Sequence, residues 1–309
     1  MPIVRGATVM RRFAEIPLSV WRQRAQSFMF RGFGIRYWAA GQGEPLLLLH
    51  GFPTAAWDWH YLWQPLTRHY RVIVCDMLGF GDSDKPRRHD YSLLEQADLQ
   101  QALLDHLQVN APVHLLAHDY GDSVAQELLA RNEEGRFAVA SCMFLNGALF
   151  AETQRALPLQ KLLQGPLGWM FGRLFDRHGL DREFGRIFAP DTRPSESELD
   201  DYWSLIASNR GTHVLHRLNA CLAERRRFRD RWVCTLQRTC VPLRLLVGLL
   251  DPASGSSTLV RYRALIADAD VALLPGVGHY PHIEAPAQVL RHYLAFRQNS
   301  APFMLDRAV

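Results

Sequence analysis

Short apolar runs alternate with longer segments of helical periodicity along most of the chain. The runs predict buried strands at residues 28–30, 35–39, 46–49, 71–75, 113–116, 138–145, 243–247 and 271–274. Between them, apolar residues recur at helical spacing and predict helices at residues 57–67, 93–107, from 124 onward, 258–266 and 286–296. The first two runs flank a glycine-containing turn and favour an antiparallel hairpin. Strands that alternate with helices predict an α/β fold, in which a mostly parallel sheet carries helices on both faces.

The alternation stops near residue 150 and resumes near residue 238. Residues 152–237 show no convincing strand pattern, and helical periodicity is visible at 157–163, 195–208 and 214–227. A mostly helical insertion is the simplest interpretation, and such an insertion at the carboxyl edge of a parallel sheet can serve as a lid. We therefore predict three segments, namely a first core part at 1–149, a helical cap at 150–237 and a second core part at 238–309.

Residues 115–124 predict a strand, an abrupt turn and a helix, with Asp119 at the turn. Ala117 and Gly121 stand two positions either side of Asp119, and small residues there let strand and helix pack closely around a strained, exposed side chain. This is the pattern of a nucleophile elbow, with Asp in place of the usual Ser. A carboxylate at that position can attack carbon and form a covalent ester. The alternative is that Asp119 only caps the following helix, since Asp is among the preferred N-cap residues.

Asp251 and His279 each follow a predicted strand in the last part of the chain. A carboxylate nucleophile needs a base that activates water against the ester, and an acid that orients this base. Asp119, Asp251 and His279 occur in the chain order of nucleophile, acid and base that one large class of hydrolases uses. A serine esterase does not fit, because no Ser stands at the elbow and Ser123 lies past Gly121.

Hydrolysis of an ester also needs hydrogen-bond donors for the developing oxyanion. Residues 50–53, with the sequence HGFP, follow the buried strand at 46–49, so that the backbone N–H of Phe52 can point at the reacting group. The second predicted donor is the backbone N–H of Tyr120, directly after the nucleophile. For the side chain of His50 we predict a structural role, in which its ring hydrogen-bonds to nearby backbone and shapes the loop.

Composition narrows the class of protein. The chain has 309 residues, 48% of them apolar, and its net charge of +4 is too weakly basic to indicate nucleic-acid binding. No apolar run is long enough to span a bilayer, and no signal peptide is recognisable. The five cysteines are scattered without metal-ligand spacing, which favours free thiols in a reducing compartment. We therefore expect a cytoplasmic protein that needs no cofactor.

Four further features carry less weight. His213 and His216 have no other ligand-type residues around them, so we predict no metal site. Asp122 lies near the start of the helix after the elbow, where its negative charge suits the helix dipole. Residues 225–231, with the sequence RRRFRDR, predict a solvated helix face, with RNA binding or an entrance for anionic substrates as the alternatives. Residues 10–25 predict a packed N-terminal arm, with a segment on a membrane surface as the alternative.

These motifs together resemble the epoxide hydrolase and haloalkane dehalogenase branch of the α/β hydrolases. The resemblance is carried by HGFP at 50–53, GFGDS at 79–83, AHDYG at 117–121, Asp251 and His279. The similarity is closer still to the mesoderm-specific transcript-like hydrolases, at 50–54, 78–86, 118–128, 193–199 and 279–281, and it covers nearly the whole chain after about residue 25. It implies an α/β-hydrolase fold with a helical cap, Asp119 as nucleophile, His279 as base and Asp251 as its partner.

The residues that would stabilise the leaving group depart from that branch. Epoxide hydrolases of this type use two cap tyrosines, and Tyr202 is the only tyrosine between residues 150 and 237. Haloalkane dehalogenases hold the halide with a Trp beside the nucleophile, where this chain has Tyr120. We therefore expect Tyr202 to contact the leaving group, with Trp203 or Tyr61 as the alternative donor.

The leading hypothesis is a hydrolase that opens a C–O or C–halogen bond of a small hydrophobic substrate through an ester on Asp119. An epoxide is favoured, because HGFP and Tyr202 suit it better than a halide. The alternatives are haloalkane dehalogenase-type activity and a non-catalytic protein that binds a hydrophobic ligand beneath its cap. A homodimer is compatible with the sequence.

Overall fold

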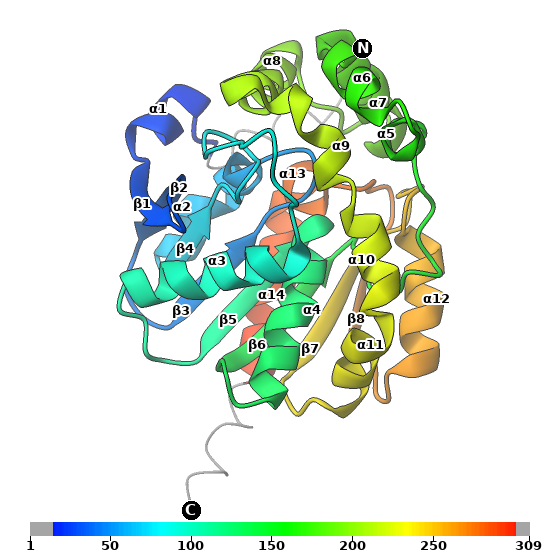
Figure 1. Cartoon of the computed structure of the whole chain (residues 1–309). Coiled ribbons are helices and arrows are strands. Elements are labelled where there is room, and N and C mark those ends of the chain that lie inside the picture. Colours follow the sequence, from blue (N-terminus) through cyan, green and yellow to red (C-terminus); the bar gives the residue numbers. More distant parts are fainter. Residues whose placement is uncertain (1–14, 301–309) are drawn as a thin grey trace, which may run out of the picture.

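A computed structural model describes residues 15–300, and its centre is a sheet of eight strands in the order β1-β2-β4-β3-β5-β6-β7-β8 (Figure 1). Strands β1, β2 and β4 pair antiparallel, and the pairs from β4 through β8 are parallel. The strands are β1 (Gln26–Phe30), β2 (Phe33–Ala40), β3 (Pro45–Leu49), β4 (Arg71–Cys75), β5 (Val113–His118), β6 (Val139–Leu145), β7 (Leu243–Gly248) and β8 (Val271–Leu274). Each predicted strand is present, and the mostly parallel sheet is confirmed.

The central strands are buried on both faces because helices cover them. All residues of β3, β5 and β6 are buried, which is why these strands are almost continuously apolar in the sequence. On the face turned forward in Figure 1 lie α3 (Leu93–His106) and α4 (Tyr120–Glu133), and on the other face lie α2 (His60–Thr67) and α14 (Pro286–Ser300). The remaining core helices are η1 (Ala56–Trp59), α12 (Gly255–Leu265) and α13 (Pro281–Glu284). The predicted α/β fold with helices on both faces is confirmed.

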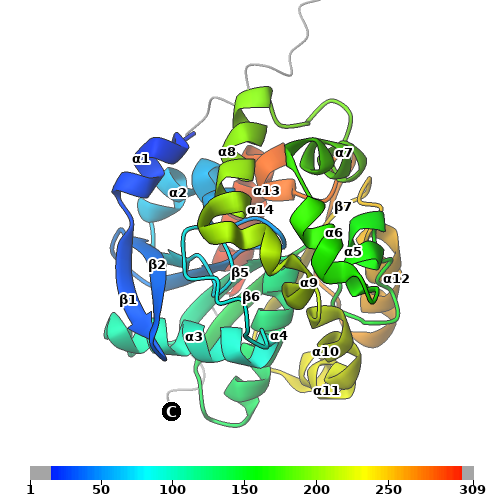
Figure 2. The ribbon, with the colours of Figure 1, turned by 45° about the horizontal axis from the view of Figure 1, so that its top comes forward.

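Between β6 and β7 the described chain forms helices and no strand. These helices are α5 (Pro158–Gln164), α6 (Gly168–Leu174), α7 (Arg177–Ile187), α8 (Glu196–Ala207), η2 (Ser208–His213), α9 (Leu215–Leu218), α10 (Cys221–Arg227) and α11 (Arg229–Arg238). Helices α5 to α8 lie across the end of the molecule at which the parallel strands finish (Figures 1 and 2). Helix α11 packs instead against α4, where Nε1 of Trp232 donates a hydrogen bond to Glu127 over 3.0 Å. The division of the chain at residues 149 and 237 stays a prediction.

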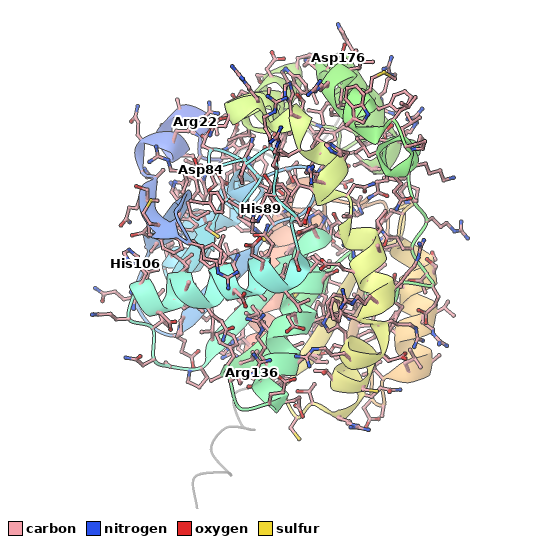
Figure 3. All side chains as sticks on the ribbon, in the orientation of Figure 1. Arg22, Asp84, His89, His106, Arg136 and Asp176 are labelled. Carbon is pink, nitrogen blue, oxygen red and sulfur yellow. The ribbon has the colours of Figure 1, made fainter. Side chains whose placement is uncertain are left out.

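The described part of the N-terminal arm packs onto the core. It contains α1 (Leu18–Gln23), in which Trp21 is buried and stacks on Trp38 with ring centroids 4.8 Å apart. Arg22, labelled in Figure 3, forms an ion pair of 2.7 Å with Asp82 in the loop between β4 and α3. The predicted packed arm is therefore confirmed for residues 15–25, and residues 10–14 lie outside the described part of the chain.

Two expectations from composition concern the whole chain. All five cysteines are free thiols, as predicted, and Cys75, Cys142 and Cys221 are buried. Within residues 15–300, no helix combines the length and the apolar character that crossing a membrane requires.

Candidate active site

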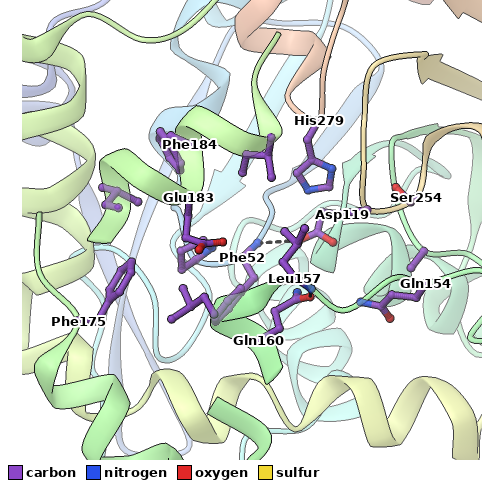
Figure 4. Close-up of a pocket in the computed structure, with 16 residues that line it drawn as sticks. Phe52, Asp119, Gln154, Leu157, Gln160, Phe175, Glu183, Phe184, Ser254 and His279 are labelled. Carbon is purple, nitrogen blue, oxygen red and sulfur yellow. Dashed lines mark hydrogen bonds between the residues drawn. The ribbon is translucent and has the colours of Figure 1, made fainter. Parts of the chain in front are cut away.

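Asp119 occupies the turn between β5 and α4 in a backbone conformation that side chains rarely adopt. Its φ angle is 47° and its ψ angle is −103°, outside the extended region of an ordinary N-cap residue, and its side chain makes no capping hydrogen bond. Asp119 therefore does not act as a helix cap. Gly121 allows the tight turn, because a Cβ at this position would collide with the backbone carbonyl of Leu49. The strained turn holds the Asp119 side chain in the wall of a cavity (Figure 4).

The carboxylate of Asp119 accepts a hydrogen bond from the HGFP loop. The backbone N–H of Phe52 donates to Oδ2 of Asp119 over 3.1 Å, the dashed line in Figure 4. Tyr120, the source of the second predicted donor, is the first residue of α4, and its buried ring lies 5.2 Å from the ring of Phe80, centroid to centroid. The Phe52 hydrogen bond has the geometry that an oxyanion donor needs when the Asp119 carboxyl carbon itself becomes tetrahedral.

His279 and Asp251 form a close pair in the same site. Nδ1 of His279 lies 3.1 Å from Oδ2 of Asp251, and Asp251 also accepts hydrogen bonds from Ser254 Oγ, over 2.6 Å, and from the N–H of Ala253, over 2.8 Å. Burial opposes the charged forms of both groups, but their mutual attraction prevails. The pKa of Asp251 is lowered, and that of His279, which also faces the Asp119 carboxylate, is raised to about 9. The structure thus brings the three residues of the predicted triad together.

Two buried histidines support this arrangement without taking part in it. Nδ1 of His50 lies 2.9 Å from the carbonyl oxygen of Gly51, and its Nε2 accepts a hydrogen bond from the N–H of Met77 over 3.1 Å. Burial lowers the pKa of His50 to about 4, so the ring is neutral, and its predicted structural role is confirmed. His118 uses Nε2 to contact the carbonyl oxygen of His279 at 2.8 Å, and it thereby fixes the loop that carries His279.

Arg225 of α10 also contacts Asp119, a contact that the sequence pattern did not indicate. Its buried guanidinium places Nη2 3.6 Å from Oδ1 of Asp119 and donates to the Asp119 carbonyl over 3.3 Å, while Nε donates to Ser123 Oγ over 2.8 Å. Burial by itself raises the pKa of Asp119. The positive charges of Arg225 and then of His279 outweigh that effect, and the pKa is lowered. Asp119 is therefore a carboxylate at neutral pH.

The predicted solvated helix face at residues 225–231 is right in part. Arg226 and Arg227 are exposed. Arg225, by contrast, is buried under the elbow, and Arg231 forms an ion pair of 2.9 Å with the buried Glu127 of α4. This basic run therefore joins the helical segment to the core at two points.

Asp122 lies in the first turn of α4, as predicted, but in surroundings that disfavour its charged form. Its side chain is buried, and a Cβ on Gly147 would collide with it. Burial, and secondarily the charge of Asp119, raise the pKa of Asp122 well above its usual range. Both effects act against an ionised carboxylate and so oppose the predicted helix-terminal charge.

The cavity at Asp119 is lined mainly by apolar side chains (Figure 4). Its walls come from the HGFP loop, from α5 and α7, and from the loops that carry Asp119, Ser254 and His279. Besides these, its polar side chains are Gln154, Gln160 and Glu183. A cavity of this kind suits a small, largely hydrophobic molecule.

Tyr202 and Trp203 lie one layer behind the cavity wall. Tyr202 is fully buried, and its ring packs against Trp57 and Phe184 at centroid distances of 5.0 Å and 5.4 Å. Phe184 lines the cavity, and so does Phe175, which contacts Trp203 at 6.0 Å. The structure therefore does not bring the two predicted leaving-group residues to the reacting site. The fallback donor Tyr61 is also absent from the cavity lining.

One buried group has metal-ligand residue types. Ligand atoms of Asp58, His118 and His282 all lie within 4.8 Å of one another. Burial raises the pKa of Asp58 and lowers those of both histidines. The expectation of no metal site, which concerned other residues, stays a prediction.

Fold and site together define the class: the chain belongs to the α/β hydrolase family, whose sequence profile matches residues 46–292. The mesoderm-specific transcript homolog protein of Homo sapiens is 42% identical over 292 residues, which cover 90% of this chain and 87% of that protein. The fold is shared with the haloalkane dehalogenase DatA from Agrobacterium tumefaciens C58, at a TM-score of 0.77 and 22% identity, covering 89% of this chain and 96% of that one. It is also shared with the epoxide hydrolase CorEH, at a TM-score of 0.75 and 20% identity, covering 88% and 97%. The resemblance inferred from the motifs is confirmed.

Proposed function

We propose that this chain hydrolyses a C–O or C–halogen bond of a small hydrophobic electrophile through a covalent ester on Asp119. The observation that carries the proposal is an ionised carboxylate, rather than a hydroxyl, at the strained elbow, 3.1 Å from the N–H of Phe52. The His279–Asp251 pair completes the set of groups that ester hydrolysis needs. A carboxylate that served only the fold would not require a positive φ angle and a place in a cavity wall.

In the first step, a carboxylate oxygen of Asp119 forms a bond to the electrophilic carbon, and the bond from that carbon to the leaving atom breaks with its electron pair. Arg225 and His279 keep Asp119 ionised for this attack. Oδ2, which Phe52 already holds, is suited to become the carbonyl oxygen of the ester.

In the second step, His279 accepts a proton from water, and the water oxygen attacks the ester carbon of Asp119. The N–H groups of Phe52 and Tyr120 hold the resulting oxyanion. Collapse of the tetrahedral intermediate releases the alcohol product, which takes the proton from His279, and restores Asp119. Ester formation removes one of the carboxylate charges that raise the pKa of His279. The imidazolium of the free enzyme then gives its proton to the alkoxide of the opened epoxide, or to solvent after a halide has left, and is neutral when the base is needed.

An epoxide is the substrate class we favour, with Gln160 in place of Tyr202 as the donor to the opening ring. The side-chain oxygen of Gln160 accepts a hydrogen bond from the N–H of Leu157 over 3.0 Å, which orients the amide N–H groups away from that contact and makes them available to a substrate oxygen. No Trp is among the described residues that line the cavity, so the indole contact of a halide site has no counterpart there.

Intact-mass spectrometry of a His279→Gln variant tests the proposal. With the base removed, the ester should persist, and a panel of small epoxides and haloalkanes should include one that adds its mass to the protein. The matched control is the double variant Asp119→Asn, His279→Gln, which should stay unmodified.

The set of compounds that form an adduct distinguishes epoxide hydrolysis, dehalogenation and ligand binding without catalysis. An adduct with epoxides supports the favoured substrate class, and an adduct with haloalkanes alone would reassign the chain to dehalogenation. No Asp119-dependent adduct with any electrophile would refute covalent catalysis and favour a ligand-binding protein.

A further inference from the structure

A second cavity lies on the surface between α6, the segment from η2 to α9, and the loop from β4 to α3. His89, labelled in Figure 3, marks this loop. Six of the seven side chains that line the cavity are basic: they are Arg87, Arg88, Arg173, His213, His216 and Arg217, around Trp169. None of these residues takes part in the chemistry proposed for Asp119.

The positive charge of this cavity is largely unbalanced. Among the ion pairs of residues 15–300, the lining arginines have one partner, Asp90, which lies 3.2 Å from Arg217 and is itself fully exposed. Arg173 lies over the ring of Trp169 at 5.1 Å. Burial, followed by the neighbouring arginines, lowers the pKa of His213. Like charges gathered in this way repel one another, so a bound anion would be stabilised there.

Exposed apolar side chains gather on the same helices. Of the eight large hydrophobic side chains exposed in residues 15–300, half fall in one short stretch, namely Leu162, Leu167, Trp169 and Leu174. Trp169 belongs to this group and to the cationic cavity, and Leu174, 69% exposed, directly follows Arg173. Single exposed apolar residues need no explanation, but a cluster beside an anion-attracting cavity marks an interaction surface.

We propose that the face formed by α5 and α6 docks on an anionic lipid surface, with lipid phosphates in the cationic cavity and Leu167, Trp169 and Leu174 at the boundary between headgroups and acyl chains. Arginines next to exposed Trp and Leu match both zones of such a surface, the charged headgroups and the apolar layer below them. Helix α5 also walls the Asp119 cavity through Leu159 and Gln160. Docking would therefore bring that cavity close to the phase in which a hydrophobic substrate dissolves, and this consequence alone rests on the proposed function.

Co-sedimentation with vesicles tests the proposal on the full-length protein without any substrate. The protein should bind vesicles that contain phosphatidylglycerol better than vesicles of phosphatidylcholine alone, and high salt should weaken the binding. Each arginine near an anionic surface is worth about fivefold in partitioning, so the double variant Arg87→Glu, Arg88→Glu should bind at least about 25-fold more weakly. The double variant Arg226→Glu, Arg227→Glu makes the same charge change on exposed residues of α10 and should bind as the wild type does.

A second pair of variants tests the contribution of exposed apolar side chains to vesicle binding. Leu174→Gln should weaken vesicle binding at low and at high salt, whereas Val260→Gln, at a site 68% exposed on α12, should not. Thermal unfolding of each variant checks that it is folded.

Three results would overturn the proposal: no preference for phosphatidylglycerol, an equal loss of binding in the α10 control, or thermal stabilisation of the wild type by inorganic phosphate without vesicle binding. The last result would assign the cavity to a soluble phosphate-bearing ligand.

Discussion

Replacing Arg225 by Met should destabilise the fold in a way that depends on pH. The guanidinium lies 3.6 Å from Oδ1 of Asp119, and both side chains are at most 10% exposed. At that distance an effective dielectric constant of about 20 gives an attraction of about 5 kcal/mol, and removing one partner of a buried pair costs about 3–5 kcal/mol. We therefore expect Arg225→Met to lower the free energy of unfolding by about 3–5 kcal/mol near neutral pH.

The pH dependence follows from the charge of Asp119. In the folded protein the pKa of Asp119 is lowered, so its charge adds stability above the unfolded pKa of about 3.9, and this stability is lost as the pH falls through the folded pKa. Without Arg225 the folded pKa rises, because burial is opposed by one positive charge fewer. The stability gap between wild type and Arg225→Met should therefore be widest near neutral pH and shrink toward about pH 4.

Urea unfolding across this pH range, in the wild-type and the Asp119→Asn backgrounds, measures the effect. In the Asp119→Asn background the pH-dependent part of the gap should vanish, and the constant part that remains reports lost packing of the arginine stem. Arg226→Met removes an exposed arginine from the same helix and should change stability by no more than about 0.5 kcal/mol. A gap of equal size at every pH, or one that Asp119→Asn leaves untouched, would show that Arg225 supports packing and does not set the charge of Asp119.

Three further predictions follow from the site. Tyr202→Phe should leave the rate of ester formation unchanged, because the ring lies behind the cavity wall; rapid quenching with mass spectrometry measures this rate. Gly121→Ala should cost about 1–3 kcal/mol or more in urea unfolding, whereas Gly165→Ala, where a Cβ meets only ordinary contacts, should cost less than about 1 kcal/mol. Asp251→Asn should lower the pKa of His279 from about 9, and an unchanged imidazole titration by NMR would contradict the pairing.

The sheet and the elbow were predictable because each requires a recognisable pattern of neighbouring residues in the sequence. A strand buried on both faces is apolar at nearly every position, and the Pro-Leu-Leu-Leu-Leu sequence of β3 shows this pattern. The elbow needs small residues two positions either side of its centre, and Ala117 and Gly121 provide them. Since parallel strands finish at one edge, polar residues that follow them, such as Asp251 and His279, converge without any further information.

Arg225 was not predictable from its charge, since a run of arginines usually faces solvent. Its position carried a weak signal. Arg225 follows Leu222 by three positions and Cys221 by four, so the three share one helix face, and that face is buried. The position of each arginine around the helix axis therefore determines which one points inward. The high charge of the run made this periodicity hard to recognise.

The expected contact between Tyr202 and the leaving group is absent for a related reason. The expectation of a proton donor rested on residue type and on location in the helical segment. Within α8, Leu199, Tyr202, Leu205 and Ile206 lie at helical spacing and form its buried face. The phenol therefore belongs to the packing between α8 and its neighbours, and the wall of the cavity is formed by α5 and α7. Periodicity places a residue on the inner face of its helix, but it does not say whether a cavity or a core lies beneath.

The buried charges around the elbow shift the pKa values of its two neighbouring carboxyl groups, Asp119 and Asp122, in opposite directions. Arg225 and protonated His279 carry positive charges that lower the pKa of Asp119, whereas burial and the charge of Asp119 raise the pKa of Asp122. Esterification of Asp119 would remove one negative charge from the surroundings of Arg225 and His279 and leave their positive charge in excess. The group that can relieve the excess is His279, because an arginine does not lose its proton in a protein. The same charge balance that holds Asp119 ionised before the attack therefore favours a neutral His279 after it, at the stage when the proposed reaction needs a base.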